Sequence, residues 1–333
     1  MAQPLFARLL QKRPDLVIDV LAPGWVRPLL QRMPQVTDTI ESPFGHGELN
    51  LRGRWRLGRS LARRGYAKAI VLPNTLKSAL VPFFADIPLR VGYVGESRYG
   101  LLNILHKLNR NSPPPMAARY LALAEPRDEP PPASLSAPLY GLARTRLSVS
   151  GSNLAITLAR LSLAPPSDAR PVAVLCPGAE FGPAKRWPAE HYADLAARLG
   201  TAGFSVWLMG SAADAPVGAA ILAARPGCAV NLCGQTDLAS AIDLIAVAHV
   251  VISNDSGLMH VAAALNRPLV ALFGSSSPLH TPPATDRARV QYLALDCSPC
   301  YARDCPLGHF RCMRELSPSK VFDETLAAAG RES

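Results

Sequence analysis

The segment at residues 253–260 has the residue types of a phosphate-binding turn. It is SNDSGLMH, and it follows a short apolar run that predicts a strand. Ser256 and Gly257 would then open a helix, where free backbone N–H groups and the helix dipole attract an anion such as a diphosphate. Asp255 is placed to accept hydrogen bonds from sugar hydroxyls, and His260 lies one turn into the helix. A helix cap followed by a packed histidine remains the alternative.

Lys185 belongs to a second segment that is predicted to reach the same place. It lies in PGAEFGPAKRWP at 177–188, directly after another strand-like run. The carboxyl ends of parallel strands meet at one edge of a sheet, so Lys185 and Asp255 should face one crevice. An ammonium group there suits a leaving nucleotide diphosphate. A third loop contains Asp214, at a position where a carboxylate often binds ribose, and a further small-residue loop follows at 274–277.

The absence of other nucleotide-binding motifs narrows the chemistry. The sequence contains no G-x-x-x-x-G-K-[ST] loop and no G-x-G-x-x-G turn, which disfavours kinase-like and dinucleotide-dependent enzymes. No D-x-D motif is placed to clamp a metal ion on a diphosphate. We therefore predict a metal-independent departure in which Lys185 and helix amides stabilise the developing charge, with no cofactor beyond the donor substrate.

Four cysteines near the carboxyl terminus form a C-x2-C-x4-C-x6-C cluster. They are Cys297, Cys300, Cys305 and Cys312, and His309 lies between the last two. In a cytosolic chain this spacing favours a metal site over disulfides. The second pair is irregularly spaced, which weakens that prediction, and a loop of reduced thiols remains the alternative.

Length and composition predict a globular chain of two domains. Its 333 residues suffice for two domains of roughly 150 residues each. Hydrophobic residues make up 49% of the chain and charged residues 18%, which excludes a disordered or coiled-coil protein. No apolar run approaches the roughly 20 residues of a membrane helix, and the first residues do not resemble a signal peptide. We predict a soluble, cytoplasmic protein.

The net charge of +10 is concentrated in one half of the chain. Residues 1–150 contain 21 Lys and Arg against 10 Asp and Glu, whereas the remainder contains 14 against 15. A basic half suggests an anionic partner: a nucleic acid, a phosphorylated substrate or the inner surface of a membrane. No recognised nucleic-acid motif supports the first of these. A solvated arginine-rich face, as at 52–56, remains the alternative.

Helical and strand-like segments alternate along both halves, which predicts parallel sheets covered by helices. In the first half we expect helices at 4–13, 59–65 and 77–84, and strands at 16–21, 69–72 and 90–93. In the second half we expect helices at 189–199, 238–248 and 257–265, and strands at 172–176, 204–209, 250–252 and 269–273. The second half is thus predicted to be a doubly wound α/β domain. A final helix near 317–329 would close that domain or cross back over the first.

The domain junction is predicted from proline-rich segments at 126–138 and 165–171. They bracket a helix-like stretch at 153–163. We therefore expect one domain at residues 1–165 and a second at residues 166–333.

Three long stretches resemble the ADP-heptose:lipopolysaccharide heptosyltransferases of glycosyltransferase family 9. They are LPNTLKSALVPFFADIPLRVGYVGESRYGLLN from Leu72, PGAEFGPAKRWP from Pro177 and NDSGLMHVAAALNRPLVALFGSSSP from Asn254. The resemblance implies a GT-B fold, in which two Rossmann-like domains face each other across a cleft. It also implies an ADP-heptose donor held by the second domain, a heptosyl-Kdo-lipid A acceptor and an inverting transfer at the cytoplasmic face of the inner membrane, where the protein would be peripheral.

The same resemblance suggests roles for individual residues. Lys185 would contact the donor diphosphate, and Asp214 is a weaker candidate for its ribose. The residues that would hold the heptose and the phosphates are Asp255, Ser256, Gly257 and His260. Those that would face the anionic acceptor are Lys77, Arg98 and Arg119. The positive charge of the first half agrees with this, although ordinary surface charge remains the alternative for Arg98 and Arg119.

The chain departs from the family at its start. Family members begin with a strand and a Gly-Asp turn, whose aspartate is the expected general base for the acceptor hydroxyl. Met1 instead falls at the start of the first predicted helix, so we expect that the chain begins late and lacks this base. The loss of a central strand would leave its neighbours without ladder partners. A donor-binding but catalytically impaired homologue, or a GT-B transferase for another sugar, is therefore the alternative function.

Overall fold

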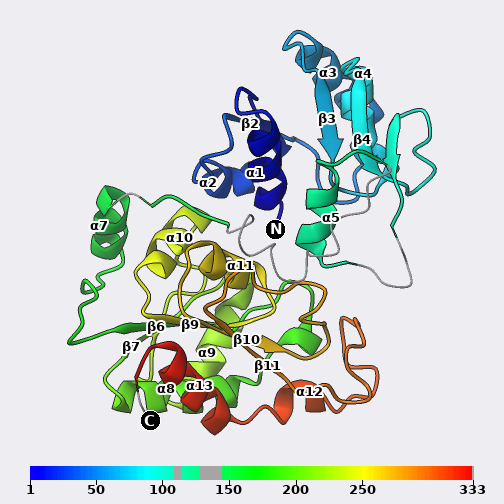
Figure 1. The fold of residues 1–333 in the computed structure, drawn as a ribbon. Coiled ribbons are helices and arrows are strands. Elements are labelled where there is room, and N and C mark those ends of the chain that lie inside the picture. The colour runs from blue at the N-terminus through cyan, green and yellow to red at the C-terminus, as the bar shows by residue number, and fades with distance from the viewer. Residues whose placement is uncertain (109–113, 128–144, 150, 332–333) are drawn as a thin grey trace. The chain divides into compact units, whose positions relative to one another are not determined.

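The computed structural model describes residues 1–108, 114–127, 145–149 and 151–331 (Figure 1). These residues form two compact units. The first, unit 1, comprises Met1–Arg27 and Gln35–Ala143, and the second, unit 2, comprises Pro28–Pro34 and Arg144–Ser333.

Unit 2 is built on a six-stranded parallel sheet. Its strands are β6 (Val172–Cys176), β7 (Ser205–Leu208), β8 (Val230–Asn231), β9 (Val250–Asn254), β10 (Leu269–Phe273) and β11 (Ala288–Tyr292). Their spatial order is β11-β10-β9-β6-β7-β8, so the direction of winding reverses between β9 and β6. This is the doubly wound sheet that the sequence predicts, with the switch point at which such sheets bind ligands.

Both faces of this sheet are covered by helices, which explains why its central strands are continuously apolar. The alternate residues Ala173 and Leu175 of β6 share one core with Leu195, while Val172 and Val174 share the other core with Ile242. The helices over the first core are α8 (Ala189–Thr201), α9 (Ala215–Ala224), α12 (Arg311–Arg314) and α13 (Pro318–Ala328). Those over the second are α7 (Gly151–Arg160), α10 (Leu238–Ala246) and α11 (Gly257–Ala264).

The division between the units differs from the predicted boundary at residue 165. Helix α7 belongs to unit 2, because Leu158 is buried in the same core as Ile242 of α10. The proline-rich segment after α7 is therefore a connection inside unit 2 and not an interdomain linker. The final helix, α13, closes unit 2 by burying Val321 and Leu326, so the first of its two predicted positions is confirmed.

Unit 1 contains two separate parallel sheets in its described residues. One pairs β1 (Asp19–Ala22) with β2 (Asp38–Glu41), and the other has the order β3 (Lys68–Val71), β4 (Leu89–Tyr93) and β5 (Ile104–His106). The helices are α1 (Gln3–Lys12), α3 (Leu51–Ala62), α4 (Leu76–Phe84) and α5 (Met116–Ala122), and the short α2 (Arg27–Leu30) spans the junction with unit 2.

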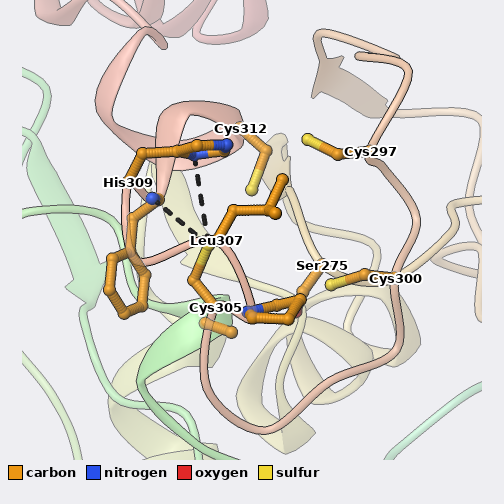
Figure 2. Close-up of a pocket in the computed structure, with 10 residues that line it drawn as sticks. Ser275, Cys297, Cys300, Cys305, Leu307, His309 and Cys312 are labelled. Atoms are coloured by element: carbon orange, nitrogen blue, oxygen red, sulfur yellow. Dashed lines mark hydrogen bonds between the residues drawn. The ribbon is translucent and has the colours of Figure 1, made fainter.

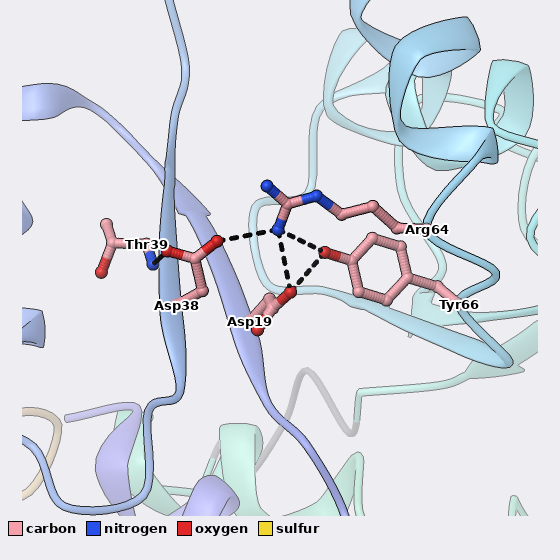
Figure 3. Close-up of polar contacts among 5 residues, drawn as sticks. All are labelled: Asp19, Asp38, Thr39, Arg64 and Tyr66. Atoms are coloured by element: carbon pink, nitrogen blue, oxygen red, sulfur yellow. Dashed lines mark hydrogen bonds and ion pairs between the residues drawn. The ribbon is translucent and has the colours of Figure 1, made fainter.

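A polar cluster joins the two sheets of unit 1 (Figure 3). Arg64, in the turn before β3, donates to Asp38 of β2 at 2.8 Å and to Asp19 of β1 at 3.2 Å. Tyr66 also donates its hydroxyl proton to Asp19. The hydrogen bond from Arg64 lowers the pKa of the Asp38 carboxyl. In the described residues no backbone ladder runs between these sheets, so side chains make this connection.

The expectation that the chain begins late and lacks a Gly-Asp turn stays a prediction.

Candidate functional site

Lys185 and Asp255 meet at the carboxyl edge of the unit 2 sheet. Lys185 ends the short 3-10 helix η3 (Pro183–Lys185) that follows β6, and Asp255 directly follows β9. These strands flank the switch point of the sheet. The Lys185 Nζ lies 2.5 Å from the Asp255 Oδ2, and their side chains are 18% and 5% exposed. The sequence prediction that these two loops meet at one edge of the sheet is confirmed.

Asp255 is held from several directions. Ser276 Oγ donates to Oδ2 at 2.6 Å, and Thr281 Oγ1 donates to Oδ1 at 3.3 Å. Its own backbone N–H donates to the Leu272 carbonyl at 3.1 Å. Ser276 and Thr281 come from the loop after β10, which the sequence predicts to lie on this rim, although their hydrogen bonds to Asp255 are found only in the structure.

The pairing leaves Lys185 able to receive an anion. Its ammonium also lies 5.3 Å from the centroid of the Phe181 ring. The hydroxyls of Ser276 and Thr281 also donate to Asp255, so its carboxylate would keep hydrogen-bond partners if Lys185 turned toward another anion. An ion pair of this kind holds the lysine side chain in position before a ligand arrives.

The amino end of α11 lies beside this pair and has no side-chain cap. Ser256 is the N-cap residue, yet its side chain makes no capping hydrogen bond, and its Oγ instead lies 3.1 Å from the Oγ of Ser253. A Cβ on Gly257 would meet no atom within 4 Å. No side chain therefore caps this helix and the space beside Gly257 is open, which suits an anion at the helix N-terminus and does not match the capping alternative.

His260 lies on the first turn of α11, as the sequence predicts. Burial is the main cause that lowers its pKa, to about 4, and the positive charge of Lys185 acts in the same direction while Asp255 opposes it. The imidazole is therefore neutral at pH 7, and it offers one hydrogen-bond donor and one acceptor to a ligand.

Asn254 is a site residue that sequence reasoning missed. It is 0% exposed at the end of β9. Its Nδ2 donates to the Pro177 carbonyl at 2.7 Å, and its Oδ1 accepts from the Tyr192 hydroxyl at 3.0 Å and from the Trp187 N–H at 3.3 Å. It thus fixes the loop of Lys185 against the strand that precedes Asp255. An amide at the end of an apolar strand was the signal that could have revealed it.

Asp214 has a structural role in the loop after β7. Its Oδ2 accepts from the backbone N–H of Ser211 at 2.9 Å and from the hydroxyl of Ser211 at 2.7 Å, which makes a capping box for η4 (Ala212–Asp214). A Cβ on Gly178 or Gly210 would lie 2.3 or 2.8 Å from its side chain, so both glycines make room for it. Its contact with a ribose stays a prediction.

Asp214→Ala is expected to lower the free energy of unfolding of unit 2 by about 1 kcal/mol, because half of the capping box is lost. Urea unfolding measures this, with the exposed Asp168→Ala as the control. ADP affinity of the folded variant decides the second role. A rise of tenfold or more in the Kd for ADP would support the ribose contact. An unchanged Kd would mean that Asp214 only caps η4 and does not bind the ribose.

The predicted acceptor contact of Arg98 needs correction. Arg98 is 1% exposed, and its guanidinium donates to the Pro73 carbonyl at 2.6 Å, to the Asn74 Oδ1 at 3.2 Å and to the Tyr93 carbonyl. Burial lowers its pKa. The side chain thus holds the loop after β3 against the end of β4, and it does not face solvent as an acceptor-binding arginine would.

Lys77 and Arg119 lie elsewhere in unit 1. Lys77 is half-buried in the first turn of α4, and Arg119, on α5, donates its Nε to the Pro114 carbonyl at 2.8 Å. Their contact with an acceptor stays a prediction.

The cysteine cluster surrounds a cavity of about 20 Å³ (Figure 2). The residues on its walls include the cysteines of the cluster, namely Cys297, Cys300, Cys305 and Cys312, together with His309. The Cys305 Sγ accepts from the Phe310 N–H at 3.4 Å and lies 4.0 Å from the His309 Nδ1. Among the described residues, no group of three or more His, Cys, Asp or Glu side chains is placed to hold a metal ion. The geometry therefore favours the thiol-loop alternative.

Elemental analysis of the purified chain tests this point. We expect zinc and iron well below stoichiometric amounts, because the thiols line a cavity without converging on one centre. Cys305→Ser is then expected to leave the metal content unchanged. About one metal ion per chain, lost in Cys305→Ser, would instead establish the metal site.

Comparison with known proteins agrees with this geometry. The model of the family described as glycosyltransferase family 9 (heptosyltransferase) matches residues 54–311. Lipopolysaccharide heptosyltransferase 2 of Escherichia coli (strain K12) is 46% identical over 97% of this chain and 93% of its own length. Lipooligosaccharide heptosyltransferase 2 of Haemophilus influenzae is 50% identical over 87% of this chain and 84% of its own.

A solved structure supports the fold class. The E. coli ADP-heptose lps heptosyltransferase II aligns with a TM-score of 0.84 at 43% identity, over 98% of this chain and 94% of that one. The predicted α/β fold of the GT-B type and the family resemblance are both confirmed. The chain belongs to glycosyltransferase family 9, the heptosyltransferases.

Proposed function

We propose that this chain transfers heptose from ADP-heptose to the heptosyl-Kdo-lipid A inner core in lipopolysaccharide synthesis. The observation that carries the proposal is the Lys185–Asp255 pair beside the uncapped amino end of α11, at the switch point of a doubly wound sheet. The names of the relatives support ADP-heptose as the donor and a lipopolysaccharide as the acceptor. The heptosyl-Kdo-lipid A core is what the family resemblance implies, and the residues of the site suit a diphosphate and a sugar.

The donor half of the reaction follows from these residues. Negative charge grows on the diphosphate as the bond between the sugar and the phosphate breaks. Lys185 and the N–H groups at Ser256 and Gly257 stabilise that charge without a metal ion. Asp255 accepts hydrogen bonds from heptose hydroxyls, and neutral His260 donates to the sugar or a phosphate oxygen. Attack from the opposite face of the sugar then gives inversion.

The acceptor half involves unit 1, whose basic residues suit an anionic lipid core. Lys77 and Arg119 are its candidate contacts. The family resemblance places the general base in a Gly-Asp turn, and this sequence contains no Gly-Asp pair. The second candidate named in the sequence analysis is a homologue that binds ADP-heptose but turns it over slowly or not at all.

The location belongs to the same proposal. We place the chain at the cytoplasmic face of the inner membrane, where its lipid-linked acceptor would lie. Within the described residues, no helix has the length and apolar character needed to cross a membrane. The peripheral attachment that we propose rests on the family resemblance and on the lipid-linked acceptor that it implies.

ADP release in the presence of ADP-heptose and a heptosyl-Kdo-lipid A acceptor tests the function. Release that requires both substrates supports the transferase. Calorimetric binding of ADP-heptose without ADP release would support the second candidate. A chain that neither binds ADP-heptose nor releases ADP would overturn both.

A further inference from the structure

Helix α3 (Leu51–Ala62) of unit 1 exposes one continuous basic face. At 3.6 residues per turn, its exposed side chains fall on a single side of the helix. They are Leu51, Arg52, Trp55, Arg56, Arg59 and Ser60, and Arg63 continues the same face at the carboxyl end. Such a surface is either a solvated face or a docking site, and the opposite side of the helix helps to decide between them.

The opposite side of α3 is fixed firmly in unit 1. A Cβ on Gly58 would lie 2.5 Å from the Cβ of Phe84 and 2.8 Å from the Val81 carbonyl, so α3 lies directly against α4. Arg54 turns inward, where it donates to the carbonyls of Leu49, Glu48 and Lys77. These contacts fix the orientation of α3 about its own axis, so the same side chains always face outward.

This outward face carries more positive than negative charge. In the described part of the chain, no carboxylate pairs with Arg52, Arg56 or Arg63, while Arg59 pairs with Asp86. The nearest acidic residue along the chain, Glu48, already accepts from the Gly45 N–H and the Asn50 side chain. Several arginines therefore remain available to an anionic partner.

Apolar side chains lie along one edge of the same face. Trp55 and Leu51 are each 52% exposed, and Leu49, just before the helix, is 48% exposed. An exposed indole beside arginines suits the interface of a bilayer, because the ring settles among headgroups while the guanidinium groups pair with phosphates. A solvated face needs no such apolar edge.

We propose that the outward face of α3 docks this chain on a bilayer that contains anionic phospholipid. The proposal rests on the peripheral location proposed above and adds the surface that provides it. Each arginine near such a surface adds attraction, and Trp55 with its leucine neighbours adds shallow insertion. Because the shared chemistry is a phosphate ester, the phosphates of the acceptor lipid form the rival ligand that the test must separate.

Sedimentation with vesicles provides the test. The vesicles contain phosphatidylglycerol in phosphatidylcholine and no acceptor lipid. The wild-type chain is expected to bind them, and to lose binding when the anionic lipid is omitted or the salt concentration is raised. The variant Arg52→Gln/Arg56→Gln should bind about 30-fold more weakly, from about 1 kcal/mol per arginine. The control Arg198→Gln/Arg225→Gln removes the same charge from exposed positions of unit 2 and should bind as the wild type does.

Fluorescence gives a second measurement at Trp55. Trp187 and Trp207 are buried, and Trp25 is 74% exposed, so Trp25→Phe leaves Trp55 as the reporting indole. Its emission is expected to shift to the blue on binding to anionic vesicles.

The other outcomes overturn the proposal. Equal weakening of both double variants would show that net charge alone is responsible, and binding only to vesicles with acceptor lipid would assign the face to the acceptor. No vesicle binding by the wild type would remove the peripheral location as well. ADP release with a soluble acceptor fragment is measured separately, so none of these results is confused with a failure of the proposed transfer.

Discussion

Lys185→Ala is expected to lower kcat/KM for ADP-heptose by about 100- to 1000-fold, the usual loss when a preorganised group for a developing anion is removed. The Lys185 Nζ is held 2.5 Å from Asp255 beside the free amino end of α11, so its charge is in place before the donor arrives. ADP release measures the turnover. Calorimetry is expected to show ADP affinity about tenfold weaker or more, because a charge-assisted contact is lost.

Two further variants sharpen this result. Lys320→Ala removes an exposed lysine from α13 and should leave both measurements unchanged. Lys185→Arg keeps the charge in a longer, planar group, so affinity should recover more than turnover. Wild-type kcat/KM and ADP affinity in folded Lys185→Ala would refute the assignment of the diphosphate to this lysine.

Asn254→Ala is expected to destabilise unit 2 by about 3–5 kcal/mol. It removes the amide partner of the Pro177 carbonyl and of the Trp187 N–H in a buried place, and each unmet group costs about 1–3 kcal/mol. The Tyr192 hydroxyl also loses Asn254, but it keeps its hydrogen bond to the Cys176 carbonyl. Urea unfolding followed by circular dichroism measures the change. Asn153→Ala on the exposed side of α7 is the matched control and should change stability by less than about 0.5 kcal/mol.

The same variant reports on positioning. At a temperature where Asn254→Ala remains folded, its ADP affinity should fall as well, because the loops of Lys185 and Asp255 lose their common anchor. A stability within about 1 kcal/mol of the wild type would mean that water or a shifted backbone replaces the amide, and the anchoring role would then be abandoned.

The central part of unit 2 was predictable because its local pattern and its tertiary environment agree. Strands such as β6 and β10 are short, apolar and buried on both faces, which is how a parallel sheet is recognised in sequence. The meeting of Lys185 with Asp255 followed from one rule, that parallel strands bring their carboxyl ends to one edge. Other elements lacked such a signal. Helix α9 is apolar on nearly every side, and β11, at the edge of the sheet, has two consecutive exposed residues and buries only Gln291 fully.

Arginines show where sequence reasoning ends. Arg54 and Arg98 are buried, whereas Arg52 is exposed. Nothing in the local sequence distinguishes the buried arginines from the exposed one. The difference depends on which backbone carbonyls a loop leaves unpaired, and those carbonyls come from segments up to 25 residues away. The boundary predicted at residue 165 differs from the division between the units for a related reason. Prolines mark an irregular connection, but the packing of Leu158 decides to which unit the preceding helix belongs.

The loop that carries Cys300 and Cys305 is hydrogen-bonded to the two segments that hold Ser276 and Lys185. The Tyr301 N–H donates to the Ser275 carbonyl at 2.7 Å, and the Ala184 N–H donates to the Arg303 carbonyl at 3.1 Å. One loop therefore touches the neighbours of both Ser276 and Lys185. Cys300 is its exposed thiol. A dye attached to Cys300 would lie on a loop that is hydrogen-bonded to both of these segments, so a change in its emission on adding ADP would report on the proposed donor site.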